Sequence, residues 1–293
     1  MIAMVFALAA LAATQQEDFD KVEVTSAKVG EGVYVLNGRG GNIGVSVGED
    51  GVLIIDDQYA PLTIKIRAAV ASLTPQPIRF VINTHWHGDH TGGNENLGKA
   101  GIVIVAQENV RNRMSVEQFI AAFGEKVPAS PKAALPIITF ADSVAFHLNG
   151  DDIQSFHVAP AHTDGDTVVH FKKANVVHMG DCFFNGIYPF IDLSSGGSID
   201  GIVAAADKVL AMVDMNTKII PGHGPMGDKA ALQAYRDVMA NIRDRVKALV
   251  TAGKTLDQVK AAQPTKDFDA KWGGGFLKPD VFTAIVYQSL KGE

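Results

Sequence analysis

Residues 84–94 read THWHGDHTGGN and directly follow the apolar run IRFVIN at residues 78–83. Within six positions this stretch carries four side chains that can coordinate a metal ion, namely His85, His87, Asp89 and His90. Such side chains are costly to bury at the end of a core strand unless something binds them. Imidazole is a good zinc ligand, and carboxylate is an acceptable one. The stretch therefore predicts a metal-binding loop at the end of a buried strand.

The order of these side chains indicates two adjacent metal positions. On an extended backbone, His85 and His87 point to the same side. Gly88 permits a tight turn after them, and this turn can direct Asp89 and His90 toward a second point. One short loop could thus supply ligands to two metal ions.

Three later residues carry the same signal, a metal-capable side chain close behind an apolar strand and beside glycine or proline. They are His162 after IQSFHV, Asp181 after VVHM and His223 after TKII. Strand ends that meet at one edge of a sheet sandwich hold such side chains on rigid supports. We therefore expect these three residues to complete the metal centre.

The other histidines after the opening stretch lie inside strand patterns, where a structural or surface role is the expected one. They are His147, His157, His170 and His178. Two of them, His157 and His178, are close enough in sequence to the expected ligands that a supporting role behind the metal stays open.

The composition fits a globular protein with a substantial core. The chain has 293 residues, of which 47% are hydrophobic and 20% charged, and its net charge is −6. No run of Lys or Arg could follow a nucleic-acid backbone, so we expect no nucleic-acid partner. The single cysteine, Cys182, excludes an intrachain disulfide.

The first residues predict export of the chain. Residues 2–13 are continuously apolar, end in small residues and are too few to span a bilayer. We interpret residues 1–13 as a signal peptide with cleavage near Ala12 or Ala13, although no Lys or Arg precedes the run. A buried N-terminal helix is the alternative. A periplasmic or secreted protein is therefore expected, with no membrane association after cleavage.

The order of elements predicts a single α/β domain over residues 22–293. Strands at 22–55, a helix at 61–73, strands at 78–83 and 101–106 and a helix at 107–123 form a first half. Residues 124–136 contain three prolines and are expected to form an irregular loop. Strands, a helix, a strand and further helices form a second half, so we expect sheets with helices on their outer faces.

One segment before the histidine stretch is expected to lie over the site. Residues 38–44, GRGGNIG, predict a hairpin with a flexible tip. Arg39 in this tip is a candidate contact for an anionic group of the substrate.

The HWHGDH stretch together with His162, Asp181 and His223 resembles the metallo-β-lactamase superfamily. The resemblance spans about residues 30–225 by motifs and implies a four-layer αββα sandwich, within the α/β (α+β) class, with metals at one edge of the two sheets. It also implies that two zinc ions are bound per chain. The implied ligands are His85, His87 and His162 for the first zinc and Asp89, His90 and His223 for the second, with Asp181 between them.

Two positions depart from the main type of β-lactamase in this superfamily. That type uses a cysteine, usually in the context GGC, whereas this chain has GDC, which favours Asp181 as the ligand and leaves Cys182 as the alternative. That type also often has a lysine three residues further on, where this chain has Phe184 or Asn185. Neither is charged, so we expect weak or promiscuous β-lactam hydrolysis, with Asn185 as a polar substrate contact.

The resemblance implies a metal-dependent hydrolase acting on a small molecule. Metal-bound hydroxide would attack an amide, ester, lactone or phosphodiester, and Asp89 would orient it. A mononuclear iron enzyme similar to persulfide dioxygenases is the alternative, because such enzymes keep the same HxHxDH spacing. A non-catalytic metal-binding protein is a third hypothesis.

Overall fold

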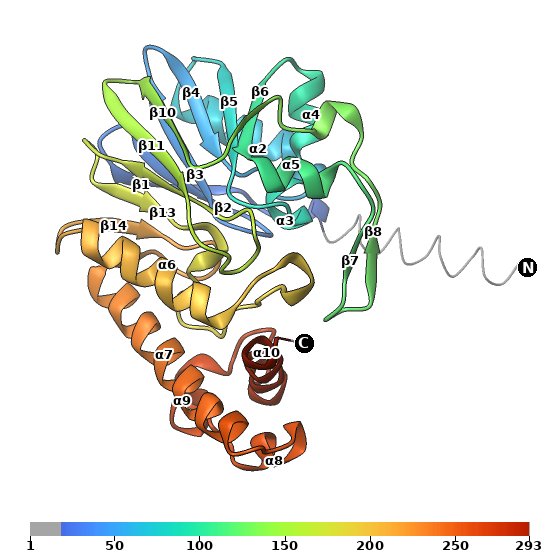
Figure 1. The fold of residues 1–293 in the computed structure, drawn as a ribbon. Helices are drawn as coiled ribbons and strands as arrows, with labels where there is room; N and C mark the ends of the chain where they lie inside the picture. Colours follow the sequence, from blue (N-terminus) through green and yellow to red (C-terminus); the bar gives the residue numbers. More distant parts are fainter. Residues whose placement is uncertain (1–18, 293) are drawn as a thin grey trace, which may run out of the picture.

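The computed structural model describes residues 19–292, so the expected signal peptide at 1–13 lies outside the described residues. Two β-sheets face each other, and helices cover the outer face of each sheet (Figure 1). The expected four-layer αββα sandwich is confirmed.

The first sheet contains the histidine stretch at the end of one of its strands. Its strands, in spatial order, are β1 (Thr25–Gly30), β2 (Val33–Asn37), β3 (Ile43–Gly48), β4 (Gly51–Ile55), β5 (Ile78–Asn83), β6 (Val103–Gln107) and β9 (Ile138–Phe140). The pairs from β1 to β4 are antiparallel, and those from β4 through β5 and β6 to β9 are parallel. The parallel arrangement brings the carboxyl ends of β4 and β5 to the same edge of the sheet.

The second sheet supplies the other strand ends. Its strands, in spatial order, are β10 (Ser143–Leu148), β11 (Asp151–His157), β12 (Thr167–Phe171), β13 (Val176–His178), β14 (Lys218–Ile220) and β15 (Gly227–Asp228). β13 and β14 are parallel, so their ends also share an edge.

The helices fall into those that precede β10 in the chain and those that follow β13. The first group is η1 (Ala60–Leu62), α2 (Thr63–Leu73), α3 (Gly88–Thr91), α4 (Asn94–Lys99), α5 (Glu108–Met114) and η2 (Lys132–Ala134). The second group is η3 (Gly180–Cys182), η4 (Leu193–Ser195), α6 (Ile199–Met212), α7 (Lys229–Thr251), α8 (Leu256–Ala261), α9 (Lys266–Trp272) and α10 (Pro279–Lys291).

Three apolar clusters fill the spaces between the four layers. Along β4, Val52 and Ile54 pack toward α2, whereas Leu53 and Ile55 pack between the two sheets, as the alternation of side chains along a strand requires. The third cluster joins the outer face of the second sheet to α6, α7 and α10. Strands buried on both faces explain the continuous apolar runs in the sequence.

The helix expected at 107–123 is wrong in its second half. α5 ends at Met114, and residues 118–127 form a separate hairpin of β7 (Gln118–Ile120) and β8 (Glu125–Val127). Helical spacing of the apolar residues was outweighed by strand pairing around Gly124, which has a φ of +63° suited to a turn. The same hairpin replaces the start of the irregular loop expected at 124–136.

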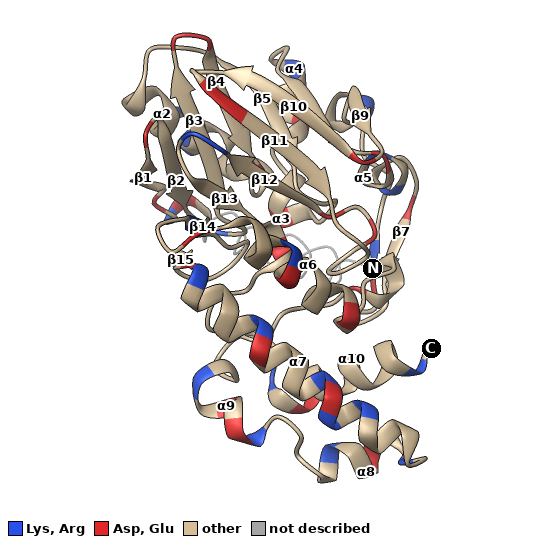
Figure 2. Ribbon diagram, turned by 60° about the vertical axis from the view of Figure 1, so that its left-hand side comes forward, with Lys and Arg blue, Asp and Glu red and all other residues tan. Residues whose placement is uncertain are grey.

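In Figure 2, which colours the ribbon by residue type, Lys and Arg positions alternate with Asp and Glu positions along α7 and α9. None of the helices in residues 19–292 combines the length and the apolar character that crossing a membrane requires.

Candidate metal centre

The opening histidine stretch forms a tight turn at the end of β5. His87 is the last extended residue before α3, and the backbone N–H groups of His90 and Thr91 both donate to its carbonyl at 3.0 Å. This turn places Asp89 and His90 in a short helix, where the His90 ring lies beside that of His85 with centroids 4.2 Å apart. The predicted turn after Gly88 is therefore confirmed.

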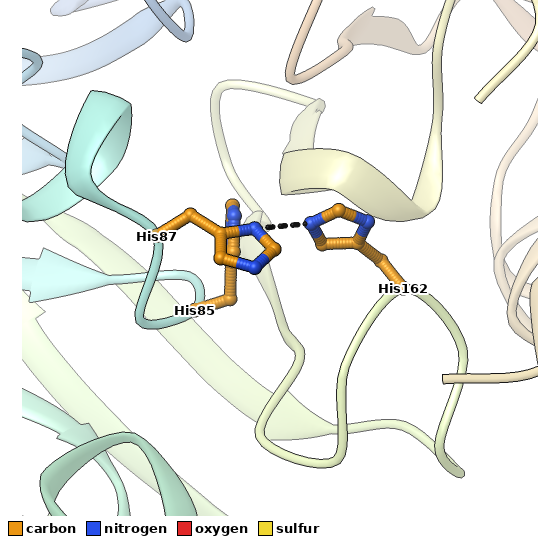
Figure 3. Close-up of side chains that lie close together, drawn as sticks. All are labelled: His85, His87 and His162. Atoms are coloured by element: carbon orange, nitrogen blue, oxygen red, sulfur yellow. Dashed lines mark hydrogen bonds between the residues drawn. The ribbon is translucent and has the colours of Figure 1, made fainter. Parts of the chain in front are cut away.

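The three later residues arrive at the same place from the second sheet. His162 follows β11, Asp181 lies in η3 after β13, and His223 follows β14. Within residues 19–292, three groups of side chains could each hold a metal ion: His85, His87 and His162; His85, His90 and Asp181; and Asp89, His90 and His223. Figure 3 shows the first group, in which a ring nitrogen of His87 approaches a ring nitrogen of His162.

Asp181 lies at the centre of these groups. Its Oδ1 is 3.1 Å from His90 Nε2, and its Oδ2 is 3.4 Å from His162 Nε2 and 3.5 Å from His223 Nε2. One carboxylate thus faces nitrogens of both the His162 group and the His223 group. Each of the seven residues expected as ligands is brought into this cluster.

Backbone and hydroxyl groups fix the orientation of two imidazole rings. His162 Nδ1 donates to the Phe190 carbonyl at 2.7 Å, because a carbonyl can only accept. His162 Nε2 is then unprotonated and points at His87 Nδ1, 2.8 Å away. His85 Nδ1 contacts Thr84 Oγ1 at 3.0 Å, which leaves His85 Nε2 directed into the cluster.

Carboxylates fix two further rings from behind. Asp56 Oδ2 lies 2.7 Å from His90 Nδ1, and Asp192 Oδ2 lies 3.0 Å from His87 Nε2. A carboxylate that accepts from the outer nitrogen of an imidazole sets its tautomer and makes the inner nitrogen a better ligand. Sequence analysis missed both carboxylates. Asp56 ends the run GVLIID, so it is a metal-capable or polar side chain directly after an apolar strand, which is the pattern used for the other residues. Asp192 does not follow such a strand.

The charges in the cluster are strongly coupled. Burial alone would raise the pKa of Asp89, but His90 and His223 outweigh it and hold that pKa at about 2. Burial would lower the pKa of His223, but Asp181 and Asp89 raise it to about 9. The pKa of Asp181 is held well below its usual range in the same way, against its burial and chiefly by His223 and His90. Both carboxylates therefore stay ionised and attract positive charge into the site.

The donor set fits a metal such as zinc. His85 Nε2 is fully buried and has no hydrogen-bond partner, and burial lowers the pKa of this imidazole, so the neutral form is available as a ligand. The backbone also approaches closely. A Cβ on Gly41 would lie 2.1 Å from His90 Cε1, and one on Gly222 would lie 1.9 Å from Asp181 Oδ1. Only glycine leaves room for these two side chains.

Cys182 belongs to none of the three groups found within the described residues. It is fully buried, and burial raises the pKa of its thiol well above the usual value, with the neighbouring Asp166 adding to the effect. The Asp166 carboxylate is itself held by the backbone N–H of His162 at 2.7 Å. A protonated buried thiol is a poor ligand, which agrees with Asp181 as the residue that faces the cluster.

A cavity of about 480 Å³ opens above the cluster. Arg39 and Gly40, in the predicted hairpin tip between β2 and β3, form part of its wall, together with Asp89 and Asp181 of the cluster. Asn185 is not among the lining residues, because its amide donates instead to the Pro225 carbonyl at 2.8 Å. Arg39 therefore lies at the cavity and Asn185 does not, and their roles as substrate contacts stay predictions.

A four-layer αββα sandwich with a buried histidine and carboxylate cluster at the edge of both sheets defines a class of metal-binding hydrolases. Residues 36–227 match the family model described as "Metallo-beta-lactamase superfamily". The chain belongs to this superfamily and is a hydrolase of it.

The relatives include β-lactamases and other hydrolases. The metallo-beta-lactamase type 2 of Bacteroides fragilis is 22% identical over 251 residues, which cover 82% of this chain and 94% of that protein. A hydroxyacylglutathione hydrolase of Nitrosococcus oceani is 27% identical over 170 residues, 56% of this chain and 55% of that protein. The structure of a metallo-beta-lactamase from Pontibacter korlensis matches with a TM-score of 0.62 at 18% identity, over 75% of this chain and 100% of that one.

Proposed function

We propose that the chain is a zinc-dependent hydrolase that binds two zinc ions and cleaves an amide, ester, lactone or phosphodiester bond of a small molecule. The observation that carries this proposal is the position of Asp181 between two sets of histidines beneath an open cavity. His85, His87 and His162 would hold one ion, and Asp89, His90 and His223 the other, with Asp181 shared. The N- and O-donor set is one that zinc accepts.

The residues of the site have separate roles. Bound zinc would lower the pKa of a coordinated water and polarise the oxygen of the scissile bond. The Asp89 carboxylate is ionised, lines the cavity and is partly exposed, so it can accept a hydrogen bond from the attacking water and orient it. Aromatic side chains, among them Phe184 and Phe190, line the cavity.

The first test measures metal content and hydrolysis on the full chain. We expect about two zinc ions per chain by elemental analysis and hydrolysis of a nitrophenyl ester, lactone or phosphodiester panel that a chelator abolishes and zinc restores. A chromogenic cephalosporin belongs in the panel. No lysine lines the cavity within the described residues, so its turnover is expected to be slow.

His162→Ala and His147→Ala form a matched pair for this test. His162 is fully buried in the cluster, whereas the His147 side chain is 77% exposed on β10. The first variant is expected to lose zinc and activity, and the second to keep both. A single iron per chain with oxygen consumption would instead support the dioxygenase alternative. Two zinc ions with no turnover of any substrate would support the non-catalytic binding protein.

A further inference from the structure

The β7–β8 hairpin forms one wall of the cavity with one of its two faces. Ile120 pairs with Glu125, and Gln118 pairs with Val127, so these four side chains share a face. Three of them, Ile120, Glu125 and Val127, line the cavity.

The tip of the hairpin adds an aromatic ring to this wall. Phe123 lines the cavity, and its ring centroid lies 4.8 Å from that of Phe190. Phe190 in turn packs against His87 of the cluster with ring centroids 5.8 Å apart. Ile187 and Phe276 line the same cavity from the second half of the chain. The apolar wall is therefore continuous with the metal centre.

The charged side chains of the hairpin disfavour the binding of an anionic group at this wall. Glu125 lines the cavity, whereas Lys126 projects from the opposite face and pairs with Glu117 at 3.1 Å. Among the described residues that line the cavity, the only permanently cationic side chain is Arg39, which comes from the β2–β3 tip and lies over the Phe19 ring. A substrate anion on the hairpin side would thus meet a carboxylate and no cation.

We propose that the substrate of this centre carries a bulky uncharged apolar group, aryl or alkyl, that packs against the hairpin face formed by Ile120, Phe123 and Val127, and that Glu125 disfavours a negative charge on that group. This inference rests on the proposed zinc centre, which anchors the reacting end of the substrate. Hairpin residues therefore determine specificity, while the cluster performs the chemistry.

Thiols that bind zinc through sulfur test this proposal without turnover. Titration calorimetry on the zinc-loaded full chain compares ethanethiol, 1-butanethiol, 2-phenylethanethiol and 4-(2-mercaptoethyl)benzoate. We expect 2-phenylethanethiol to bind about tenfold more tightly than ethanethiol, because its ring leaves water. The carboxylate of the benzoate is expected to remove much of this gain. The butanethiol result shows whether an alkyl group serves as well as an aryl group.

Two pairs of variants, each with a test substitution on the hairpin and a control substitution on it or next to it, extend the experiment. Phe123 and Phe119 are similarly exposed, at 52% and 53%, but only Phe123 lines the cavity. Phe123→Ala should weaken the binding of 2-phenylethanethiol about fivefold, because part of the apolar wall is lost. Phe119→Ala should leave this affinity unchanged. Glu125→Gln should tighten binding of the benzoate several-fold, and Glu117→Gln should not.

Equal affinities for all four thiols, or equal effects of Phe119→Ala and Phe123→Ala, would overturn the inference while the zinc centre stands. A chain that takes up no zinc would instead overturn the proposed function. The two failures are therefore distinguishable.

Discussion

The orientation of the His87 ring in the candidate metal centre depends on one carboxylate, that of Asp192. Asp192 accepts from His87 Nε2 and is itself held by the Ser195 hydroxyl and backbone N–H. The Ser195 hydroxyl also accepts from Trp86 Nε1 at 3.1 Å. This network connects the loop before α6 to the histidine stretch and fixes the tautomer in which His87 Nδ1 faces His162.

Asp192→Ala removes the acceptor while all seven expected ligands remain. We expect zinc at the His87 group to bind about 10- to 100-fold more weakly, as is usual when the partner of a metal-bound imidazole is lost. Competition with a chromophoric chelator measures the change. Asp200→Ala, a substitution of an exposed aspartate at the start of α6, is the matched control and should leave the affinity unchanged. Equal affinities in the two variants would contradict the positioning role.

Asp181 and Cys182 are adjacent, and their environments predict opposite effects of alanine substitution on metal content and activity. Asp181→Ala removes the carboxylate that faces both His162 and His223, so we expect the protein to lose the second metal and its activity. Cys182→Ala removes a buried thiol that lies outside all three groups, so we expect both metals and most of the activity to remain. Elemental analysis of the two variants decides between them. The reverse pattern would show that Cys182 is the ligand.

The seven residues of the cluster could be selected from sequence because each lies shortly after an apolar strand, where a polar side chain is costly to bury unless it binds something. The same reasoning applies to Asp56, which has a φ of +65° directly after β4 but was not among the expected ligands. Asp192 could not be found in this way, since it lies in a loop that only the tertiary fold brings to His87. Asn185 stays a predicted substrate contact, but it does not line the cavity and its amide donates to backbone carbonyls.

The β7–β8 hairpin is the element where sequence reasoning went furthest wrong. Residues 115–123 have apolar spacing that suits a helix, but two of the side chains concerned, Phe119 and Phe123, stay about half exposed. The hairpin is held by three residue pairs and by burial of Ile120 against the core. A helix would lose that pairing, and no local pattern reveals that a partner strand follows.

The turn of this hairpin makes a prediction about its stability. Gly124 has a φ of +63°, and a Cβ there would meet nothing within 4 Å, so Gly124→Ala adds backbone strain without a clash. Strain of about 1 kcal/mol should raise the population of the open hairpin about fivefold. Trypsin cleavage after Lys126 should accelerate accordingly. Gly274→Ala, with equal space and no left-handed φ, is the control. An unchanged cleavage rate would show that the turn does not hold the hairpin closed.

At the scale of the whole molecule, the match to the superfamily ends at residue 227, and α7 to α10 follow it. These helices pack into the same apolar cluster as the outer face of the second sheet. The further helices expected at the end of the second half include α7 and α10, which each bury one face, whereas their mutual packing depends on long-range contacts that no periodic pattern encodes. The single domain expected over residues 22–293 stays a prediction, and the C-terminal helices provide its test.

Phe282 on α10 links this C-terminal region to the metal centre. Its ring stacks on Tyr188 with centroids 4.6 Å apart, and Tyr188 lies in the segment that leads to Phe190 and Asp192. Phe282→Ala should lower the free energy of unfolding by about 3–5 kcal/mol and the melting midpoint by roughly 10 °C. If the chain unfolds as one unit, circular dichroism and zinc release will shift together. Val281→Ala, at a neighbouring position that is 47% exposed, should change neither the melting midpoint nor zinc release. Two separate unfolding transitions, with the temperature of zinc release unchanged, would instead show that the C-terminal helices form a domain independent of the sandwich.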